Sequence, residues 1–228
     1  MYVSKHFAER DLNVLHDSIE ESRFGVLVLC GDGPLAAHIP FVLERDAGPR
    51  GTLRAHVARA DPLARQLGAG AEALAIFGGP KAYVSPRWLA HGGLPTYNYV
   101  AVHAHGTPAV LAEPSAVWRH LGELAEVHER ERARTSTRHP SAAPWSIEDA
   151  EPGLVERLLE HIVAFELPIA SIQGKRKLSQ NRSAENRAAV ISGLRDGGGE
   201  DQVAIAELMA GYLYDSDVER SLVSDPER

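Results

Sequence analysis

The chain has 228 residues, of which 44% are hydrophobic and 24% are charged, and its formal net charge is -7. This composition is typical of a globular protein with one large domain or two small ones, and the acidic balance disfavours a nucleic acid as partner. The single cysteine, Cys30, excludes a disulfide framework and a cysteine-built zinc site. No apolar run approaches the roughly 20 residues that span a bilayer, and the first residues lack a signal-peptide core, so we expect a cytoplasmic protein that does not cross a membrane.

The first third of the chain predicts a short helix, a series of strands and a second short helix. Asp11 is a typical N-cap, and apolar residues follow it at helical spacing. Apolar, branched runs between turn signals predict strands at residues 24–30, 36–43, 52–58 and 73–77. The turn Gly-Asp-Gly-Pro joins the first two strands into a hairpin. Asp61 and Pro62 open the second helix.

The remaining two thirds predict further strands at residues 97–105 and 162–169, and helices at residues 114–134, 152–160, 184–194 and from Val203 onward. Residues 109–112 extend or pair with the 97–105 strand, residues 135–144 form a mobile polar loop, and the tail from Asp215 is frayed. Many short strands between turn signals predict a sheet that closes into a barrel. The predicted fold class is α+β, mainly antiparallel β.

The strand at residues 97–105 alternates strictly between two kinds of side chain. One face carries rings and nitrogens, from Tyr97, Tyr99, Ala101, His103 and His105, and the other carries Asn98, Val100, Val102 and Ala104. Rings and nitrogens of this kind could line the wall of a pocket that binds a flat ligand. The alternative interpretation is a strand with one face in the core and two histidines at its edge.

A basic cluster stands out in this acidic chain, just before a predicted helix start. Its cations are Lys175, Arg176, Lys177 and Arg182, and between them lie Ser179, Gln180 and Asn181. Free amides at a helix N-terminus together with nearby cations favour an anion, such as a phosphate or a pair of propionates. A capped helix with a solvated basic face is the alternative.

Histidines are the second signal, because several lie on predicted strands, where side chains are held rigidly: His38, His56, His103 and His105. No carboxylate or third histidine stands at a diagnostic spacing for zinc. A single axial ligand to haem requires no spacing, and a hydrogen-bonded structural role is the alternative for each ring. The sequence has no dinucleotide fingerprint, P-loop or hydrolase nucleophile elbow.

Several segments, taken in order, resemble the PaiB-type proteins of the FMN-binding split-barrel superfamily. These segments are MYVSKHF, FGVLVLCGDGPLAAHIPF, LRAHVARADP, GGPKAYVSPRW, LPTYNYVAVHAHG and GKRKLSQNR. They cover most of the chain, to about Leu194. The resemblance implies a six-stranded FMN-binding split β-barrel with flanking helices, in residues 1–195, followed by a C-terminal helix and polar tail in residues 196–228.

The resemblance also implies a homodimer with the cofactor at the subunit interface. By matching motif, the cofactor-binding residues are His56, Tyr83, Ser85, Thr96, Asn98, Lys177, Ser179, Gln180, Asn181 and Arg182. The family takes its name from a negative regulator of sporulation and protease genes. For this chain, the net charge and the lack of a helix-turn-helix signature weigh against a regulator that binds DNA.

Three departures from the family pattern point to a specialised member. The family usually has Asn-Pro-Gln-Trp where this chain has Asp-Pro-Leu-Ala from Asp61, histidine in place of Lys81, and tryptophan in place of Tyr97. These changes open space near the pocket and place a lysine at its rim. They suit the haem-dependent piperazate synthases, a branch that resembles this family and acts in natural-product biosynthesis.

That second resemblance implies haem b as cofactor and an amino acid, N5-hydroxyornithine, as small-molecule substrate. The α-amine would attack the side-chain nitrogen, an N–N bond would form, and the hydroxyl would leave as water. His56 would be the axial ligand, with His38 and His103 as alternates, and Lys81 and Tyr97 would be catalytic. Lys177 and Arg182 would hold an anionic arm of the cofactor. The alternative is a PaiB-like oxidoreductase with FMN, or a negative transcriptional regulator.

Overall fold

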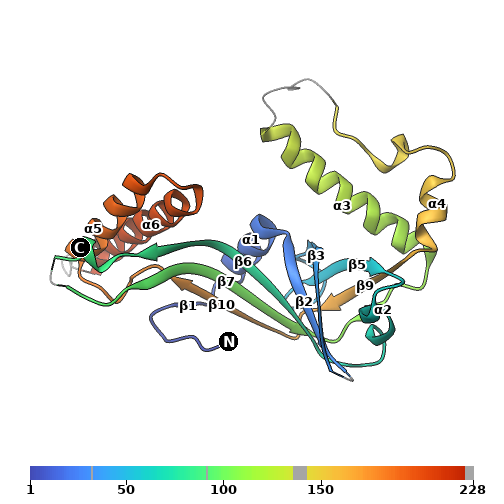
Figure 1. Cartoon of the computed structure of the whole chain (residues 1–228), viewed down its shortest axis with the longest axis horizontal. Helices are drawn as coiled ribbons and strands as arrows, with labels where there is room; N and C mark the ends of the chain where they lie inside the picture. The colour runs from blue at the N-terminus through green and yellow to red at the C-terminus, as the bar shows by residue number, and fades with distance from the viewer. Residues whose placement is uncertain (32, 91, 136–142, 224–228) are drawn as a thin grey trace. The chain divides into compact units, whose positions relative to one another are not determined.

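The computed structural model of the chain describes residues 1–31, 33–90, 92–135 and 143–223 (Figure 1). Most of the predicted loop at residues 135–144 and the last five residues of the predicted tail lie outside the described residues. Every helix within the described ranges is too short or too polar to cross a membrane.

Within the described residues, six α-helices form where caps and apolar spacing place them. They are α1 (Leu12–Ser22), α2 (Pro62–Gln66), α3 (Pro114–Thr135), α4 (Leu154–Leu159), α5 (Ala184–Gly197) and α6 (Glu200–Val223), with short 3-10 turns η1 (Pro86–Trp88) and η2 (Ile147–Asp149). Asp11 caps α1 as predicted, since its carboxylate accepts a hydrogen bond from the Asn13 amide at 2.8 Å. The helix α6 extends to Val223, and the fraying predicted from Asp215 stays a prediction.

The strands form two sheets whose described ladders are antiparallel, which confirms the predicted α+β class. The strands are β1 (Ala8–Glu9), β2 (Phe24–Cys30), β3 (Pro34–Pro40), β4 (Val42–Glu44), β5 (Thr52–Ala58), β6 (Ala73–Val84), β7 (Thr96–Gly106), β8 (Ala109–Val110), β9 (Ile162–Pro168) and β10 (Ser171–Lys177). One sheet has the order β1-β10-β7-β6-β2-β3, and the other has the order β4-β5-β9-β8.

Several strand boundaries differ from the prediction. The strand β6 runs seven residues past the predicted end at Phe77, through Gly78, Gly79 and Pro80. These residues look like a turn, but a Cβ at Gly79 would lie 2.9 Å from the Val100 side chain, so the glycine permits a close approach of β7 rather than a turn.

Two further differences concern pairing. The predicted strand at residues 36–43 is divided into β3 and β4 near Phe41, whose amide bonds instead to the Arg23 carbonyl at 2.8 Å. The strand β8 pairs with β9, and the prediction that it extends or pairs with the 97–105 strand is wrong.

The strand β10 was not predicted, because lysines and arginines fill most of its second half.

The chain packs as two units, each built around its own apolar core. Unit 1 comprises Met1–Arg10, Gly78–Ala101 and Gly174–Arg228, and unit 2 comprises Asp11–Phe77 and Val102–Gln173. The core of unit 2 includes Leu27, Phe41, Phe77 and Phe165. That of unit 1 joins β6 to α5 and α6 through Val84, Leu178, Val190, Leu194, Ile205 and Met209. The boundary predicted after residue 195 stays a prediction, although α5 and α6 share one core.

Candidate functional site

Aromatic and cationic side chains line the exposed face of the sheet in unit 1. Burial alternates along these parts of β6 and β7, so that odd-numbered residues face away from the core. Tyr83 and Tyr97 meet across the two strands with ring centroids 5.8 Å apart, and both are about half exposed. The Lys175 ammonium lies 5.2 Å from the Tyr99 ring centroid. We call this surface the Tyr–Lys face, formed by Lys81, Tyr83, Tyr97, Tyr99, Lys175 and Lys177.

Lys177 lies at the centre of the positive charge on this face. Its ammonium donates hydrogen bonds to the Thr96 hydroxyl and, at 2.6 Å, to the Tyr97 carbonyl. Burial lowers the pKa of Lys177, and the nearby cations Lys175 and Arg182 lower it further. Among the described residues, no ion pair joins Lys175, Arg176, Lys177 or Arg182 to a carboxylate. An anionic group bound here would supply the missing counter-charge.

The opposite side of the same strands holds a buried polar pair. Asn98 is fully buried, and its amide nitrogen donates to the Ser179 hydroxyl at 3.0 Å and approaches the Met209 sulfur at 3.3 Å. Ser179 has a left-handed backbone, with φ of 62°, which a residue with a side chain rarely adopts. Asn98 therefore holds the strained turn that follows Lys177. A direct contact of Asn98 or Ser179 with a cofactor stays a prediction.

The turn after Lys177 is closed by its own side chains. The Gln180 amide accepts from the Leu178 backbone at 2.8 Å and donates to the Arg176 carbonyl at 2.5 Å. A Cβ at Gly93 would lie 3.4 Å from an Arg182 guanidinium nitrogen, so Arg182 reaches the loop that precedes β7. Asn181 is exposed. The turn thus presents Arg182 and Lys177 in one fixed arrangement.

Two other predicted site residues are engaged within the chain. The Ser85 hydroxyl caps η1 by accepting from the Arg87 amide at 3.2 Å. Lys81 lies on the Tyr–Lys face, but its ammonium is 3.5 Å from a carboxylate oxygen of Asp201 at the start of α6. Both partners are more than half exposed, so this ion pair is weak and can open.

Of the predicted iron ligands, His56 has the most defined surroundings, and it lies in unit 2. Its Nδ1 is 3.1 Å from Nε2 of His120 on α3, a residue that the sequence did not single out. Burial lowers the pKa of both rings, and His56 and Arg54 also lower the pKa of His120, to about 4. Both rings are therefore neutral at pH 7. The Nε2 of His56 makes no hydrogen bond to a described residue.

The two alternates have less suitable surroundings. His38 is exposed on β3, where its ring stacks on Phe24 with centroids 6.5 Å apart. His103 is half-buried on β7, and burial lowers its pKa. Within the described ranges, no cluster of three or more histidine, cysteine, aspartate or glutamate side chains is arranged to hold a metal ion.

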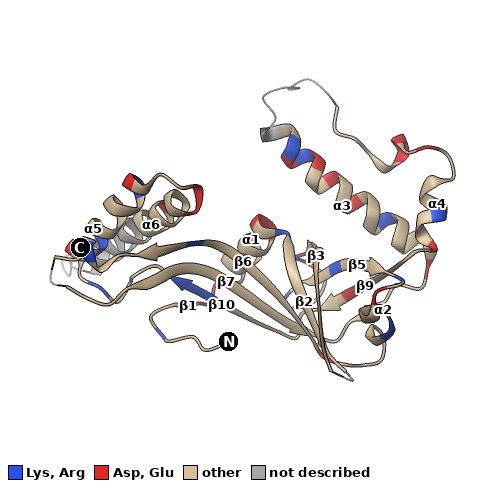
Figure 2. Cartoon of the chain, in the orientation of Figure 1, with Lys and Arg blue, Asp and Glu red and all other residues tan. Residues whose placement is uncertain are grey.

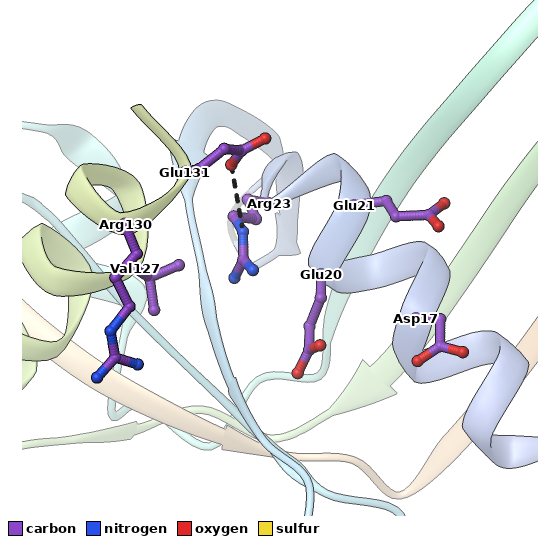
Figure 3. Close-up of a pocket in the computed structure, with 7 residues that line it drawn as sticks. All are labelled: Asp17, Glu20, Glu21, Arg23, Val127, Arg130 and Glu131. Carbon is purple, nitrogen blue, oxygen red and sulfur yellow. Dashed lines mark ion pairs between the residues drawn. The ribbon is translucent and has the colours of Figure 1, made fainter. Parts of the chain in front are cut away.

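A hollow between α1 and α3 in unit 2 has different chemistry (Figure 3). Its lining is mostly charged: Asp17, Glu20, Glu21, Arg23, Val127, Arg130 and Glu131. Several of these charges are paired, since Arg23 lies 3.7 Å from Glu131, and Arg45 binds Asp17 and Glu20 at 2.6 and 2.7 Å. The hollow offers no aromatic surface, so we do not place the functional site there.

Comparison with known proteins decides the family. The family model described as "Putative FMN-binding domain" matches residues 1–171. The chain is also 30% identical over 214 residues to "Protease synthase and sporulation protein PAI 2" of Bacillus subtilis (strain 168), which covers 93% of this chain and 98% of that protein. The chain belongs to the PaiB-like FMN-binding family.

Solved structures confirm the split-barrel fold. The structure of the FAD and haem binding protein from Mycobacterium smegmatis matches with a TM-score of 0.55 at 19% identity, over 80% of this chain and 78% of that one. The flavocytochrome Anf3 from Azotobacter vinelandii matches with a TM-score of 0.50 at 14% identity, over 82% of this chain and 78% of that one. For the PaiB-like chain described here, these likenesses establish the fold.

The family match also bears on the Tyr–Lys face. Its tyrosines on β6 and β7 lie inside the matched residues, whereas Lys175, Lys177 and Arg182 lie after residue 171. Sequence reasoning found these cations as a cluster and found Tyr97 and Tyr99 by their alternation, whereas Tyr83 came from the family resemblance. It missed His120, because the contact with His56 joins residues 64 positions apart and leaves no local pattern.

Proposed function

We propose that this chain binds a flat, conjugated cofactor that carries two negative charges, and that the Tyr–Lys face holds it. The observation that carries this proposal is Lys177, a half-buried cation among other cations and beside exposed tyrosine rings. Tyrosine rings can stack on the face of a planar ring system, and the lysine ammonium attracts a phosphate as a compact point charge. The phosphate of FMN and the two propionates of haem both fit this set of residues.

Haem is the cofactor that we place first. The support comes from His56, whose Nδ1 is engaged by His120 while its Nε2 has no described partner, the arrangement that an iron-ligating histidine usually has. A haem iron, when bound, supplies a centre that can weaken an N–O bond. In unit 2 the chain's own part is to fix the His56 ring through its contact with His120.

The finer form of the proposal is a reaction of the piperazate-synthase kind. In N5-hydroxyornithine the α-amine would form a bond to the side-chain nitrogen and give up a proton, while the N–O bond breaks and the oxygen leaves as water, with no external oxidant or reductant. Tyr97 is more than half exposed, so its hydroxyl is free to meet a leaving oxygen. Lys81 would leave Asp201 to bind the substrate carboxylate. The family resemblance and these two departures support this form.

FMN is the second candidate, because the family model that matches residues 1–171 is one of FMN-binding domains. In that case the protein is an FMN-dependent oxidoreductase or a flavin-binding regulator. The same Tyr–Lys face would serve, with the phosphate at Lys177 and the flavin ring on the tyrosines. His56 would then have no role as a metal ligand.

Replacing Lys177 with methionine is expected to raise the dissociation constant of the bound cofactor about 10- to 100-fold, because a charge-assisted hydrogen bond contributes about 1.5 to 3 kcal/mol. The measurement is an absorption titration of the purified chain with haem and, separately, with FMN. Lys5→Met is the matched control, since Lys5 is an exposed lysine of the same unit. Saturation of the wild-type chain by neither compound would overturn the proposal, and a Soret band or a flavin spectrum would identify the cofactor.

We also propose a homodimer, which the family resemblance implies. The outward face of β2, β3 and β6 in unit 2 carries no lysine, arginine, aspartate or glutamate. Its ladder pairs Val26 with both His38 and Ile76, and Val28 with both Ala36 and Leu74. Phe24 on this face is 57% exposed. Figure 2 shows β2 without charge along its length. An uncharged sheet surface of this kind is typical of a protein–protein interface.

Replacing Val28 with arginine is expected to convert the dimer to a monomer, because the new charge would lose its water in the interface. Light scattering after size exclusion measures the mass of the particle. Val110→Arg is the control, since Val110 is an exposed valine on β8, in the other sheet. A wild-type chain that elutes as a monomer, or a dimer that Val28→Arg leaves intact, would contradict the proposal.

A further inference from the structure

The first residues of unit 1 turn back beside β10, the strand that carries two lysines of the Tyr–Lys face. The strand β1 pairs with β10, and the pairing continues where the Arg176 amide donates to the Phe7 carbonyl at 2.9 Å. Before Phe7 the chain reverses in a turn, which the Phe7 amide closes by donating to the Ser4 carbonyl at 3.0 Å. Residues 1–3, which we call the arm, therefore return alongside β10 (Figure 1).

One lysine of the face holds the arm. The Lys175 ammonium donates a hydrogen bond to the Tyr2 carbonyl at 3.2 Å, and it lies 5.9 Å from the centroid of the Tyr2 ring. The same ammonium lies 5.2 Å from the Tyr99 ring centroid, so it is within cation–π range of one ring on the arm and one ring on the sheet. The two rings are therefore no farther apart than these two distances together, about 11 Å.

A planar ligand stacked between the two tyrosine rings is compatible with this limit. Carbon atoms in contact lie about 3.5 to 4 Å apart, so a flat ring system with a tyrosine on each side separates the two tyrosines by about 7 to 8 Å. The flexible stem of Lys175 allows its ammonium to move to the edge of such a ligand and to pair there with an anionic group.

The Tyr2 ring is exposed although its backbone is held. The residue is 84% exposed, while its carbonyl is bound to Lys175. Binding sites usually bury about 70 to 90% of a ligand's surface, whereas the open face of a sheet covers only one side of a flat molecule. The Tyr–Lys face alone therefore leaves the outer side of a flat ligand in water, and the Tyr2 ring is the aromatic group that the arm brings near that side.

We propose that the arm closes over the Tyr–Lys face and that the Tyr2 ring covers the outer side of the planar, anionic ligand bound there. This inference rests on the proposed function and deepens it, because it assigns to the site a binding residue that precedes the first strand. Exposed side chains change rotamer within nanoseconds, so closure of the ring requires no rearrangement of the sheet.

The first test asks whether Lys175 holds the arm in the ligand-free chain. NMR spectra of protein with carbon-13 in its tyrosine rings report the surroundings of each ring, and Tyr2→Phe identifies the Tyr2 signal. We expect Lys175→Met to shift the signals of Tyr2 and Tyr99, because both rings lose the ammonium. Arg195→Met is the matched control, since Arg195 is an exposed cation of the same unit, paired with Glu207. An unchanged Tyr2 signal in Lys175→Met would overturn the inference.

The second test measures how much the Tyr2 ring contributes to binding. Absorption titrations with haem and with FMN give the dissociation constants of the wild-type chain and its variants. We expect Tyr2→Ala to raise the dissociation constant about 10-fold, as the loss of an aromatic stacking partner does, and Tyr2→Phe to keep the wild-type value, because the ring makes the contact. Tyr212→Ala is the control, since Tyr212 is an exposed tyrosine on α6 of the same unit.

The outcomes of this titration separate the inference from the proposed function. If the wild-type chain binds haem or FMN and Tyr2→Ala binds it equally well, the proposed function stands and the inference fails. A lower dissociation constant in Tyr2→Ala would show that the arm obstructs the face, and it would overturn the inference as well. If the wild-type chain binds neither compound, the proposed function fails and the inference fails with it.

Discussion

Asn98→Ala is expected to lower the free energy of unfolding by about 3 kcal/mol. The change removes a fully buried amide and leaves the buried Ser179 hydroxyl without its partner, and such a hydroxyl costs about 1 to 3 kcal/mol in addition to the lost hydrogen bonds. The left-handed backbone at Ser179 would also lose its support. Denaturant unfolding followed by circular dichroism measures the loss.

The control for this prediction comes from the same turn. Asn181→Ala removes an identical amide from an exposed position and should change stability by less than about 0.5 kcal/mol. If both variants lose the same amount, the buried pair does not support the turn. Asn98→Ala should also weaken cofactor binding, because the turn that it holds presents Lys177 and Arg182.

Acidification is expected to destabilise the ligand-free chain by about 3 kcal/mol through His120 alone. Burial, together with His56 and Arg54, lowers the pKa of His120 from 6.5 to about 4, so that the folded state resists a proton that the unfolded state accepts. The stability is therefore fully present above pH 6.5 and is lost as the pH falls from 6.5 to about 4, by about 1.4 kcal/mol for each pH unit.

The measurement is the free energy of unfolding at several pH values, for the wild-type chain and for His120→Gln. The amide does not titrate, so the difference between the two curves isolates the contribution of His120 from that of the carboxylates. We expect this difference to change steadily between pH 6.5 and 4 and to be constant above pH 7. Parallel curves over the whole range would show that His120 is protonated equally in both states.

Local pattern predicted much of the fold and one side of the site. The alternation from Tyr97 onward correctly separated the half-exposed rings from the buried residues of β7, since a strand allows only two faces. It could not tell that the Asn98 side lies under helices, because that depends on contacts with Ser179 and Met209 more than 80 residues away. Gly78 and Gly79 resemble a turn in the sequence, so the continuous strand β6 was not predicted. The role of Gly79 depends on its close approach to Val100 on β7, which the local sequence does not show.

Charged residues prevented the prediction of another element, the strand β10. The basic segment was predicted to precede a helix, but its first half is β10, where Lys175 and Lys177 project from the sheet over tyrosines. A strand with charges on its open face has too few apolar residues for its period to be recognised. The contact between His56 and His120 could not be predicted, because His56 stood out only as a histidine on a strand and His120 did not stand out at all.

The division of the chain has a consequence for its synthesis on the ribosome. Unit 2 ends at Gln173, whereas unit 1 takes its final segment from the last 55 residues, Gly174–Arg228. At about 5 to 20 residues per second, those residues emerge over about 3 to 11 seconds after the barrel core is fully translated. Before that segment emerges, a nascent chain carries Tyr83 and Tyr97 without Lys175, Lys177, α5 or α6. The proposed binding surface, the Tyr–Lys face, is therefore incomplete until the segment that carries Lys175 and Lys177 has emerged.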